Sequence, residues 1–143
     1  MKSEISAQFN SDIKKVWNTV TNNEDYSWRS DIEKIEILDH GDAFVEHSKN
    51  NIKTTFYITK KVKYDSYEFK MENKNFFGTW KGCFMETKDG GTKIIFTEEI
   101  FMKNLIMRVL SHLFMNPSKM QSSYINDLRI KLGEFDESNA VDV

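Results

Sequence analysis

Two glutamates, Glu46 and Glu98, are the side chains best suited to acid–base chemistry or to holding a polar group of a ligand. Both fall in strand-like runs that also contain large apolar residues. An inward-facing carboxylate is costly unless it is paired, hydrogen-bonded or protonated. Two interpretations stay open for each glutamate: a ligand handle or general acid/base, and a structural hydrogen bond or a bulge that turns the residue outward.

The alternation of side chains along a strand indicates which glutamate faces inward. Glu98 has the parity of Phe96, so we expect it to lie on the apolar face. Glu46 has the parity of Phe44, but its strand is short, and an inward set beginning at Val45 fits equally well. The inward orientation is therefore better supported for Glu98.

The segment DYSWRSD places two large aromatic residues and an arginine among acidic residues. Trp28 and Tyr26 are suited to plug one end of an apolar face, while Arg29 can pair with Asp25, with Asp31 or with an acidic group of a ligand. The plainer interpretation is a hydrophobic plug with a surface ion pair, which contributes little to stability. The alternative interpretation is that this segment lies at the edge of a pocket.

An aromatic face runs through the predicted strands. Its members are Phe56, Tyr67, Phe69, Trp80, Phe84 and Phe96. Periodicity alone favours a solid core. Gly78 and Gly82 flank Trp80 on the same face, however, and missing side chains there leave space, permit strong curvature of the sheet, or both. A pocket for a small apolar molecule is the alternative to a solid core.

The sequence contains no motif typical of a metal site or of a catalytic nucleophile. His40, His47 and His112 are scattered, and Cys83, the only cysteine, has no partner at ligand spacing. Neither a Gly-x-Ser-x-Gly elbow nor a phosphate-binding loop occurs. We therefore expect no cofactor, no metal ion and no recognisable set of catalytic residues.

Composition indicates an ordinary globular protein. Of the 143 residues, 39% are hydrophobic and 29% are charged, which is enough for a real core. The net charge of −2 predicts no general attraction to nucleic acid or to an anionic membrane. No apolar run approaches the length of a membrane span, and the first residues lack the apolar core of a signal peptide. We expect a cytoplasmic protein without stable membrane insertion; the sequence does not indicate its oligomeric state.

Periodicity divides the chain into three parts. Residues 4–9 alternate like a strand, and a helix follows to about residue 22, capped by Asn10 or Ser11, with a second short helix or turn after it. Six strands joined by hairpins are predicted between residues 32 and 101. Helical spacing then returns, in two pieces because Asn116 and Pro117 favour a new helix start. Its apolar positions are Ile106, Leu110, Leu113, Met120, Tyr124, Leu128, Leu132 and Phe135.

These elements predict one α+β domain over residues 1–135, followed by a frayed tail at 136–143. A curved sheet with one apolar face needs a cover, and the long terminal helix is the obvious one. The predicted architecture is a helix grip: a seven-stranded, curved antiparallel sheet wrapped around a long C-terminal helix, with two short helices between the first and second strands.

The order of these elements and their local motifs resemble the START-like, Bet-v-type superfamily (SRPBCC), especially its polyketide cyclase/dehydrase-like bacterial branch. The motifs extend over nearly the whole chain; they are Val16-Trp17, WRSDI at 28–32, VE at 45–46, FFGTW at 76–80, GGTKIIFTEE at 90–99, NLIMRVL at 104–110 and MQSSYINDL at 120–128. The resemblance implies a helix-grip fold with a cavity between the sheet and the terminal helix. Relatives hold lipids, sterols, hormones or polyketide intermediates there, and some are enzymes, so the fold does not settle the function.

Three functions are compatible with the sequence. The leading hypothesis is binding of a small hydrophobic or amphipathic molecule, with Trp28, Phe56, Tyr67, Phe69, Trp80, Phe84 and Phe96 supplying apolar area and Glu46, Glu98 and Tyr124 supplying polar contacts. The second is a cyclase or dehydratase using acid/base chemistry on a polyketide-like substrate. The third is a chaperone-activator-like module, which would need an exposed apolar patch.

Overall fold

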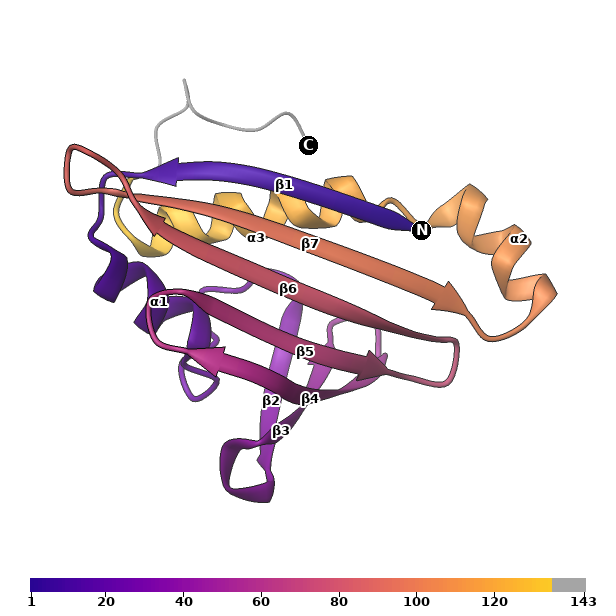
Figure 1. Ribbon diagram of the computed structural model, residues 1–143. Coiled ribbons are helices and arrows are strands. Elements are labelled where there is room, and N and C mark those ends of the chain that lie inside the picture. The colour runs from indigo at the N-terminus through magenta and orange to yellow at the C-terminus, as the bar shows by residue number, and fades with distance from the viewer. Residues whose placement is uncertain (135–143) are drawn as a thin grey trace.

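A single antiparallel sheet organises the molecule, which was analysed as a computed structural model describing residues 1–134 (Figure 1). Its strands are β1 (Lys2–Phe9), β2 (Ile32–Leu38), β3 (Ala43–Ser48), β4 (Lys53–Val62), β5 (Ser66–Glu72), β6 (Phe76–Glu86) and β7 (Thr92–Met102). The spatial order is β1-β7-β6-β5-β4-β3-β2, so β2 to β7 form a meander and β1 pairs with β7. The predicted α+β architecture of seven antiparallel strands is confirmed.

Helix α1 (Ile13–Thr21) begins one step later than predicted. Its N-cap is Asp12, whose carboxylate accepts a hydrogen bond of 2.8 Å from the backbone N–H of Lys15. The predicted caps Asn10 and Ser11 instead donate their own backbone N–H groups to the carboxylate of Glu134. The prediction of Asn10 or Ser11 as the cap was therefore wrong, because a distant glutamate binds that turn.

The predicted second short helix between β1 and β2 is absent from the described residues. The stretch between α1 and β2 forms turns, in which the backbone N–H of Arg29 donates to the carbonyl oxygen of Tyr26. The indole Nε1–H of Trp28 donates to the carbonyl oxygen of Asp25 over 2.9 Å. These local bonds hold the segment in a turn rather than in a regular helix.

The core lies between the inner face of the sheet and helices α1 and α3. On α1, the apolar stripe buries Val16 and Trp17. The Trp17 ring meets the Phe84 ring edge to face, with 4.9 Å between the ring centroids. Ile94 on β7 is fully buried in the same cluster. This end of the sheet is a solid aromatic and aliphatic core.

Helix α3 (Pro117–Lys131) covers the side of the sheet formed by β1 and β7 (Figure 1). As predicted, Asn116 is its N-cap and Pro117 its first residue. The helix buries Ile125 and Leu128, and the Gln121 amide nitrogen donates to backbone carbonyl oxygens of both covered strands. Helix α3 alone is therefore the element that the sheet grips.

Helix α2 (Leu105–Phe114) projects from the body at the other end of β7 (Figure 1). The sequence predicts that Ile106, Leu110 and Leu113 belong to the apolar face in the core, together with Met120 of α3, but all four are exposed. The side of α2 that faces the protein carries Ser111, which is buried. That part of the prediction was wrong, because helical spacing identifies an apolar face without identifying what covers it. The remaining predicted helical position, Phe135, and the predicted tail at 136–143 lie outside the described residues.

Candidate functional site

Five of the ten predicted ligand-binding residues lie half-buried along the inner face of the sheet and the adjoining helix α3. They are Trp28, Glu46, Trp80, Glu98 and Tyr124. Ring contacts connect them: Trp28 meets Tyr124 with 5.4 Å between centroids, and Tyr124 meets the buried Phe96 at 5.7 Å. Phe96 in turn lies 4.7 Å from Trp80, whose cross-strand neighbour is Glu98.

The remaining five predicted residues are buried. They are Phe56, Tyr67, Phe69, Phe84 and Phe96. Phe69 and Phe96 pack directly under the half-buried group, whereas Phe84 packs on Trp17 in the solid end of the core. The structure thus divides the predicted aromatic face into a half-open surface and the packed layer that supports it.

The two glycines that flank Trp80 have different reasons to be there. Its ring stacks on Phe69 with 4.8 Å between centroids and lies over Gly82, where an added Cβ would come within 2.7 Å of the indole. The space predicted at Gly82 is therefore occupied by the Trp80 ring itself. At Gly78, an added Cβ would meet the backbone carbonyl oxygen of Glu99 at 2.3 Å, so this glycine permits close approach of β7.

An ion pair between Arg29 and Glu46 lies beside Tyr124, at one side of the half-buried residues. The guanidinium of Arg29 lies 3.1 Å from the carboxylate of Glu46 and binds Asp31 through two nitrogens at 2.9 and 3.0 Å. Its charge also sits 4.8 Å from the centroid of the Tyr124 ring, a cation–π contact. Phe44, next to Glu46 on its own face, is buried in the core. Glu46 therefore points inward, one of the two orientations that the sequence left open.

Burial and pairing act in opposite directions on these charges. Burial raises the pKa of the Glu46 carboxyl group, and the Arg29 guanidinium opposes that shift. Burial also lowers the pKa of Arg29, but the neighbouring carboxylates of Glu46 and Asp31 more than offset it and leave the pKa raised. Arg29 is therefore a permanent cation in this site. The pKa of the Tyr124 hydroxyl is raised, chiefly by burial, so it stays a neutral hydrogen-bonding group.

Glu98 is the carboxyl group without a partner. It faces inward between Trp80 on β6 and Ser3 on β1, and it has no hydrogen bond or ion pair among the described residues. Burial, reinforced by the negative charge of Glu46, raises its pKa from 4.5 to about 7. At neutral pH a large share of Glu98 is protonated, so it can donate as well as accept a hydrogen bond.

Two further polar side chains near Glu98 were missed by the sequence reasoning. The Ser3 hydroxyl, opposite Glu98 across the β1–β7 pair, and the Oε1 atom of Gln121 are both buried without a hydrogen-bond partner. Parity along β1 places Ser3 on the same face as Ile5, which was a usable signal. Gln121 lies four residues before Ile125 on α3, and that spacing places it on the buried face.

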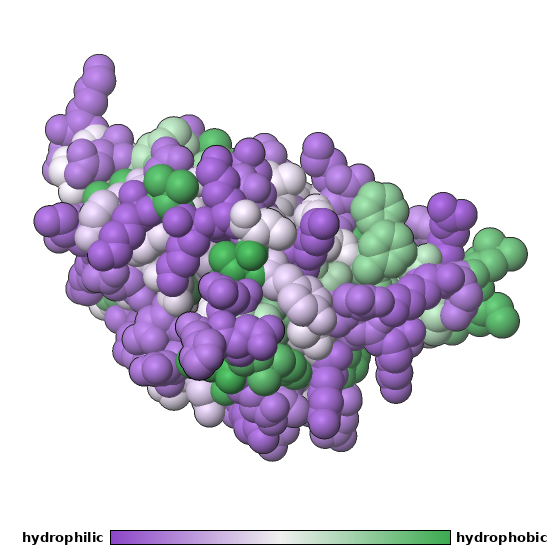
Figure 2. Space-filling view, turned by 60° about the horizontal axis from the view of Figure 1, so that its bottom comes forward, coloured by the Kyte–Doolittle hydropathy of each residue, from purple (hydrophilic) through white to green (hydrophobic). Residues whose placement is uncertain are grey.

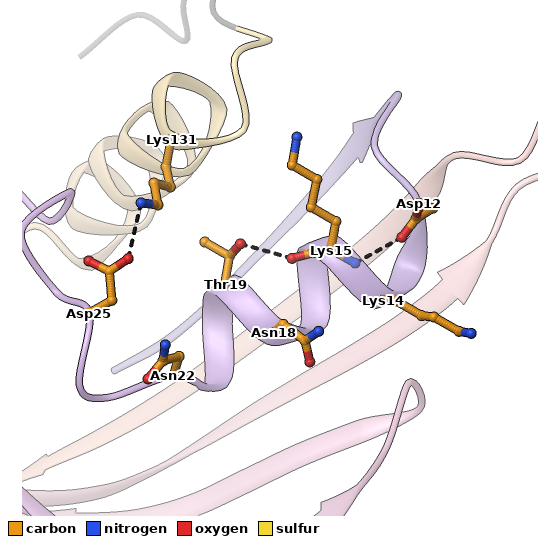
Figure 3. Close-up of a pocket in the computed structure, with 8 residues that line it drawn as sticks. All are labelled: Asp12, Lys14, Lys15, Asn18, Thr19, Asn22, Asp25 and Lys131. Carbon is orange, nitrogen blue, oxygen red and sulfur yellow. Dashed lines mark hydrogen bonds and ion pairs between the residues drawn. The ribbon is translucent and has the colours of Figure 1, made fainter.

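Two hollows at the surface of the described residues lie away from this group. One, between α1 and α3, is lined by polar side chains; Lys131 pairs with Asp25 at 3.0 Å, and Asp12 and Thr19 bond to the backbone of Lys15 (Figure 3). Another lies on the opposite face of the sheet, beside the stacked and exposed rings of Phe77 and Phe101. Neither contains an unpaired buried group. Within residues 1–134, no cluster of His, Cys, Asp and Glu side chains is arranged to hold a metal ion.

Solved structures share this fold over nearly the whole chain, although the sequence matches no protein-family model and no curated protein. The Zhui aromatase/cyclase from a Streptomyces species has a TM-score of 0.79 at 10% identity, with 99% of each chain covered. A conserved protein from Geobacillus kaustophilus has a TM-score of 0.73 at 11% identity, covering 94% of this chain and 96% of that chain. A START superfamily protein from Mycobacterium smegmatis has a TM-score of 0.71 at 10% identity, covering 93% and 94%.

The chain therefore has the helix-grip fold that the sequence resemblance implied, and it shares this fold with the START superfamily protein and the aromatase/cyclase. At these identities the likeness concerns the fold. The chemistry of this chain has to be argued from its own residues.

Proposed function

We propose that the protein binds a small hydrophobic or amphipathic molecule of lipid, sterol or polyketide type on the inner face of its sheet. The observation that carries this proposal is the half-buried aromatic surface around Trp80 with an unpartnered carboxyl group, Glu98, within it. A surface of this composition combines apolar area with a few convergent polar groups, as small-molecule sites do.

The apolar part of the ligand would replace water over Trp80 and Ile58, which lie on either side of Phe69 in the cross-strand register. Both side chains are only half-buried although they face the core side of the sheet. Burying such surface contributes about 25 cal/mol per Å² of apolar area removed from water. The rigid layer of stacked rings beneath them would hold this surface in place without reorganisation.

The polar part of the ligand would be oriented by Glu98 and Tyr124. A partly protonated Glu98 can accept from a ligand hydroxyl or donate to a ligand carbonyl oxygen. The Arg29–Glu46 pair fixes the Tyr124 ring through the cation–π contact, and Asp31 binds the other side of the guanidinium. A ligand with one apolar body and one or two oxygen atoms fits this arrangement.

Intrinsic tryptophan fluorescence tests the proposal. Titration with a long-chain fatty acid, a sterol and an aromatic polyketide should give a saturable change in emission for at least one of them. Trp80→Phe should remove most of that change. Ile58→Glu should weaken binding by about tenfold or more, because it places a charge on the apolar surface.

The matched control is Tyr57→Glu, one residue earlier on β4, where the side chain is exposed on the opposite face. It should leave binding unchanged. Thermal unfolding of each variant separates loss of binding from loss of folding. A titration in which no ligand class changes the emission, or in which both charge variants weaken binding equally, would refute the proposed site.

A second candidate function is acid/base catalysis of a cyclisation or dehydration on a polyketide-like substrate. The specific observation in its favour is the pKa of Glu98 near 7, which suits proton exchange at neutral pH. With a substrate that the protein turns over, Glu98→Gln should abolish turnover and retain binding. Glu99→Gln, on the outer face of the same strand, should leave both turnover and binding unchanged.

A further inference from the structure

Helix α2 has apolar side chains that are exposed and do not pack on the rest of the chain. Leu105, Ile106, Val109, Leu110 and Leu113 are all exposed. Ile106 and Leu113 expose 73% and 72% of their surface. Figure 2 shows hydrophobic residues gathered at the end of the molecule where α2 projects. A contiguous exposed apolar surface of this kind marks a contact with another molecule or with a lipid surface.

The charges around α2 indicate what that contact is. Residues 100–126 contain no Asp or Glu, although the whole chain has 22 of them against 20 Lys and Arg. The charged side chains of this stretch are Lys103, Arg108 and Lys119. The apolar helix is thus set in a basic stretch of a protein whose net charge is negative.

The hairpin between β5 and β6 adds another basic residue, Lys74, near the start of α2. The backbone N–H of Lys103 donates to the carbonyl oxygen of Asn75, which brings the hairpin that carries Lys74 beside the start of α2. Glu72, the last residue of β5, is paired with Lys103 at 2.7 Å. Among the described residues, Lys74, Arg108 and Lys119 remain without an ion pair, so these three unpaired charges are positive.

We propose that α2 docks the protein reversibly on the surface of a membrane that contains anionic lipids. The apolar side chains of α2 would enter the boundary between headgroups and acyl chains, and the surrounding Lys and Arg side chains would contact the negative headgroups. No helix among the described residues is both long and apolar enough to cross a membrane, so the contact is interfacial. Two copies packed through α2 would instead bring like charges together, which disfavours a dimer through this face.

Co-sedimentation of the full chain with vesicles tests this docking. The probes are vesicles of phosphatidylcholine alone and vesicles in which about a third of the lipid is phosphatidylglycerol. We expect clear binding to the anionic vesicles, little binding to the neutral ones, and weaker binding as the salt concentration rises. Arg108→Gln should weaken binding several-fold.

Substitutions at exposed positions separate docking from folding. Ile106→Glu and Leu113→Glu should each weaken vesicle binding by about tenfold or more, because each puts a charge on the inserted face. Ile130→Glu is the matched control: it removes an apolar side chain that is 59% exposed on α3 and should leave binding unchanged. Because these positions are exposed, all three variants should keep the unfolding midpoint of the parent protein.

The proposal is overturned if the parent protein binds neither kind of vesicle, or binds both equally without a salt effect. It is also overturned if Ile106→Glu and Leu113→Glu bind as the parent does. A dimer in solution that Leu113→Glu dissociates, without vesicle binding, would assign α2 to a second copy of the chain. A monomer that binds no vesicles would leave the helix to a protein partner.

Discussion

The two ends of the inner face of the sheet differ in how they are covered. At the closed end, helix α1 seals the sheet, and Trp17, Phe84 and Ile94 are almost completely buried. At the open end, Trp80 and Glu98 face the same side of the sheet but are only half-buried. One continuous aromatic face thus serves as core at one end and as an accessible surface at the other. The comparison teaches that one end of these strands serves stability, while the other end is the part on which the proposed binding depends.

The closed end should carry most of the stability. Trp17→Ala should lower the free energy of unfolding by about 3–5 kcal/mol, because it removes a large buried side chain and leaves a cavity. Leu113→Ala in the exposed helix α2 is the comparison, and it should change that free energy by less than about 0.5 kcal/mol. Urea unfolding at equilibrium measures both. Equal losses for the two variants would mean that α2 packs on the body in solution.

The ion pair at the edge of the open end should have an intermediate effect. Arg29→Met leaves the Glu46 carboxylate half-buried without its partner and should cost about 2–3 kcal/mol of unfolding free energy. Glu46→Gln keeps the shape of the side chain and should cost less, because Arg29 retains Asp31.

A double-mutant cycle isolates the pair itself. Arg29→Met combined with Glu46→Gln should recover much of the loss seen for Arg29→Met alone, since no unpaired carboxylate remains. Chemical unfolding of the four proteins at neutral pH gives the coupling energy. Strictly additive losses would show that the contact contributes nothing beyond its two separate side chains.

The smallest expected effect depends on pH and belongs to Glu98. Its pKa of about 7 lies above the ordinary 4.5 of an unfolded glutamate, so between these values the folded state holds a proton that the unfolded state releases. Stability from this group is complete below about pH 4.5 and is lost as the pH rises through about 7. Glu98→Gln removes that loss. The variant should therefore exceed the parent by about 1–2 kcal/mol near pH 8, after allowance for solvent screening, and should match it near pH 4.

Unfolding by urea at several pH values checks this prediction, with Glu99→Gln on the outer face of the same strand as the control. A constant difference between Glu98→Gln and the parent across the range would show that the carboxyl group is fully hydrated. The ligand experiments above would then lose their polar anchor, while the aromatic surface would be unaffected.

Local patterns were sufficient to predict most of the fold. Alternating residues and turn signals between residues 32 and 101 gave six consecutive strands, and the Asn116-Pro117 pair gave the start of α3. Parity along β7 was sufficient to point Glu98 inward beside Phe96. These features depend on neighbours in the sequence, which is why they could be predicted.

Features that depend on distant contacts could not be predicted. The cap of α1 moved to Asp12 because Glu134 binds the preceding turn. Glu46 was fixed inward by Arg29, which lies 17 positions earlier in the chain. The Trp80 ring lies over Gly82 while it stacks on Phe69 of the neighbouring strand β5. Each outcome required knowing where a second element lies in space.

The seam between β1 and β7 has a consequence for how the chain folds. Strand β1 pairs with residues more than 80 positions later, from Phe9 with Thr92 to Lys2 with Glu99. Gln121 then joins both strands to α3. During synthesis β1 is made before the other strands, and it cannot pair until β7 has also been made. Contacts of such high sequence separation slow folding, so closure of this seam should be the late step, and until then the edge of β7 is open to pairing with another chain.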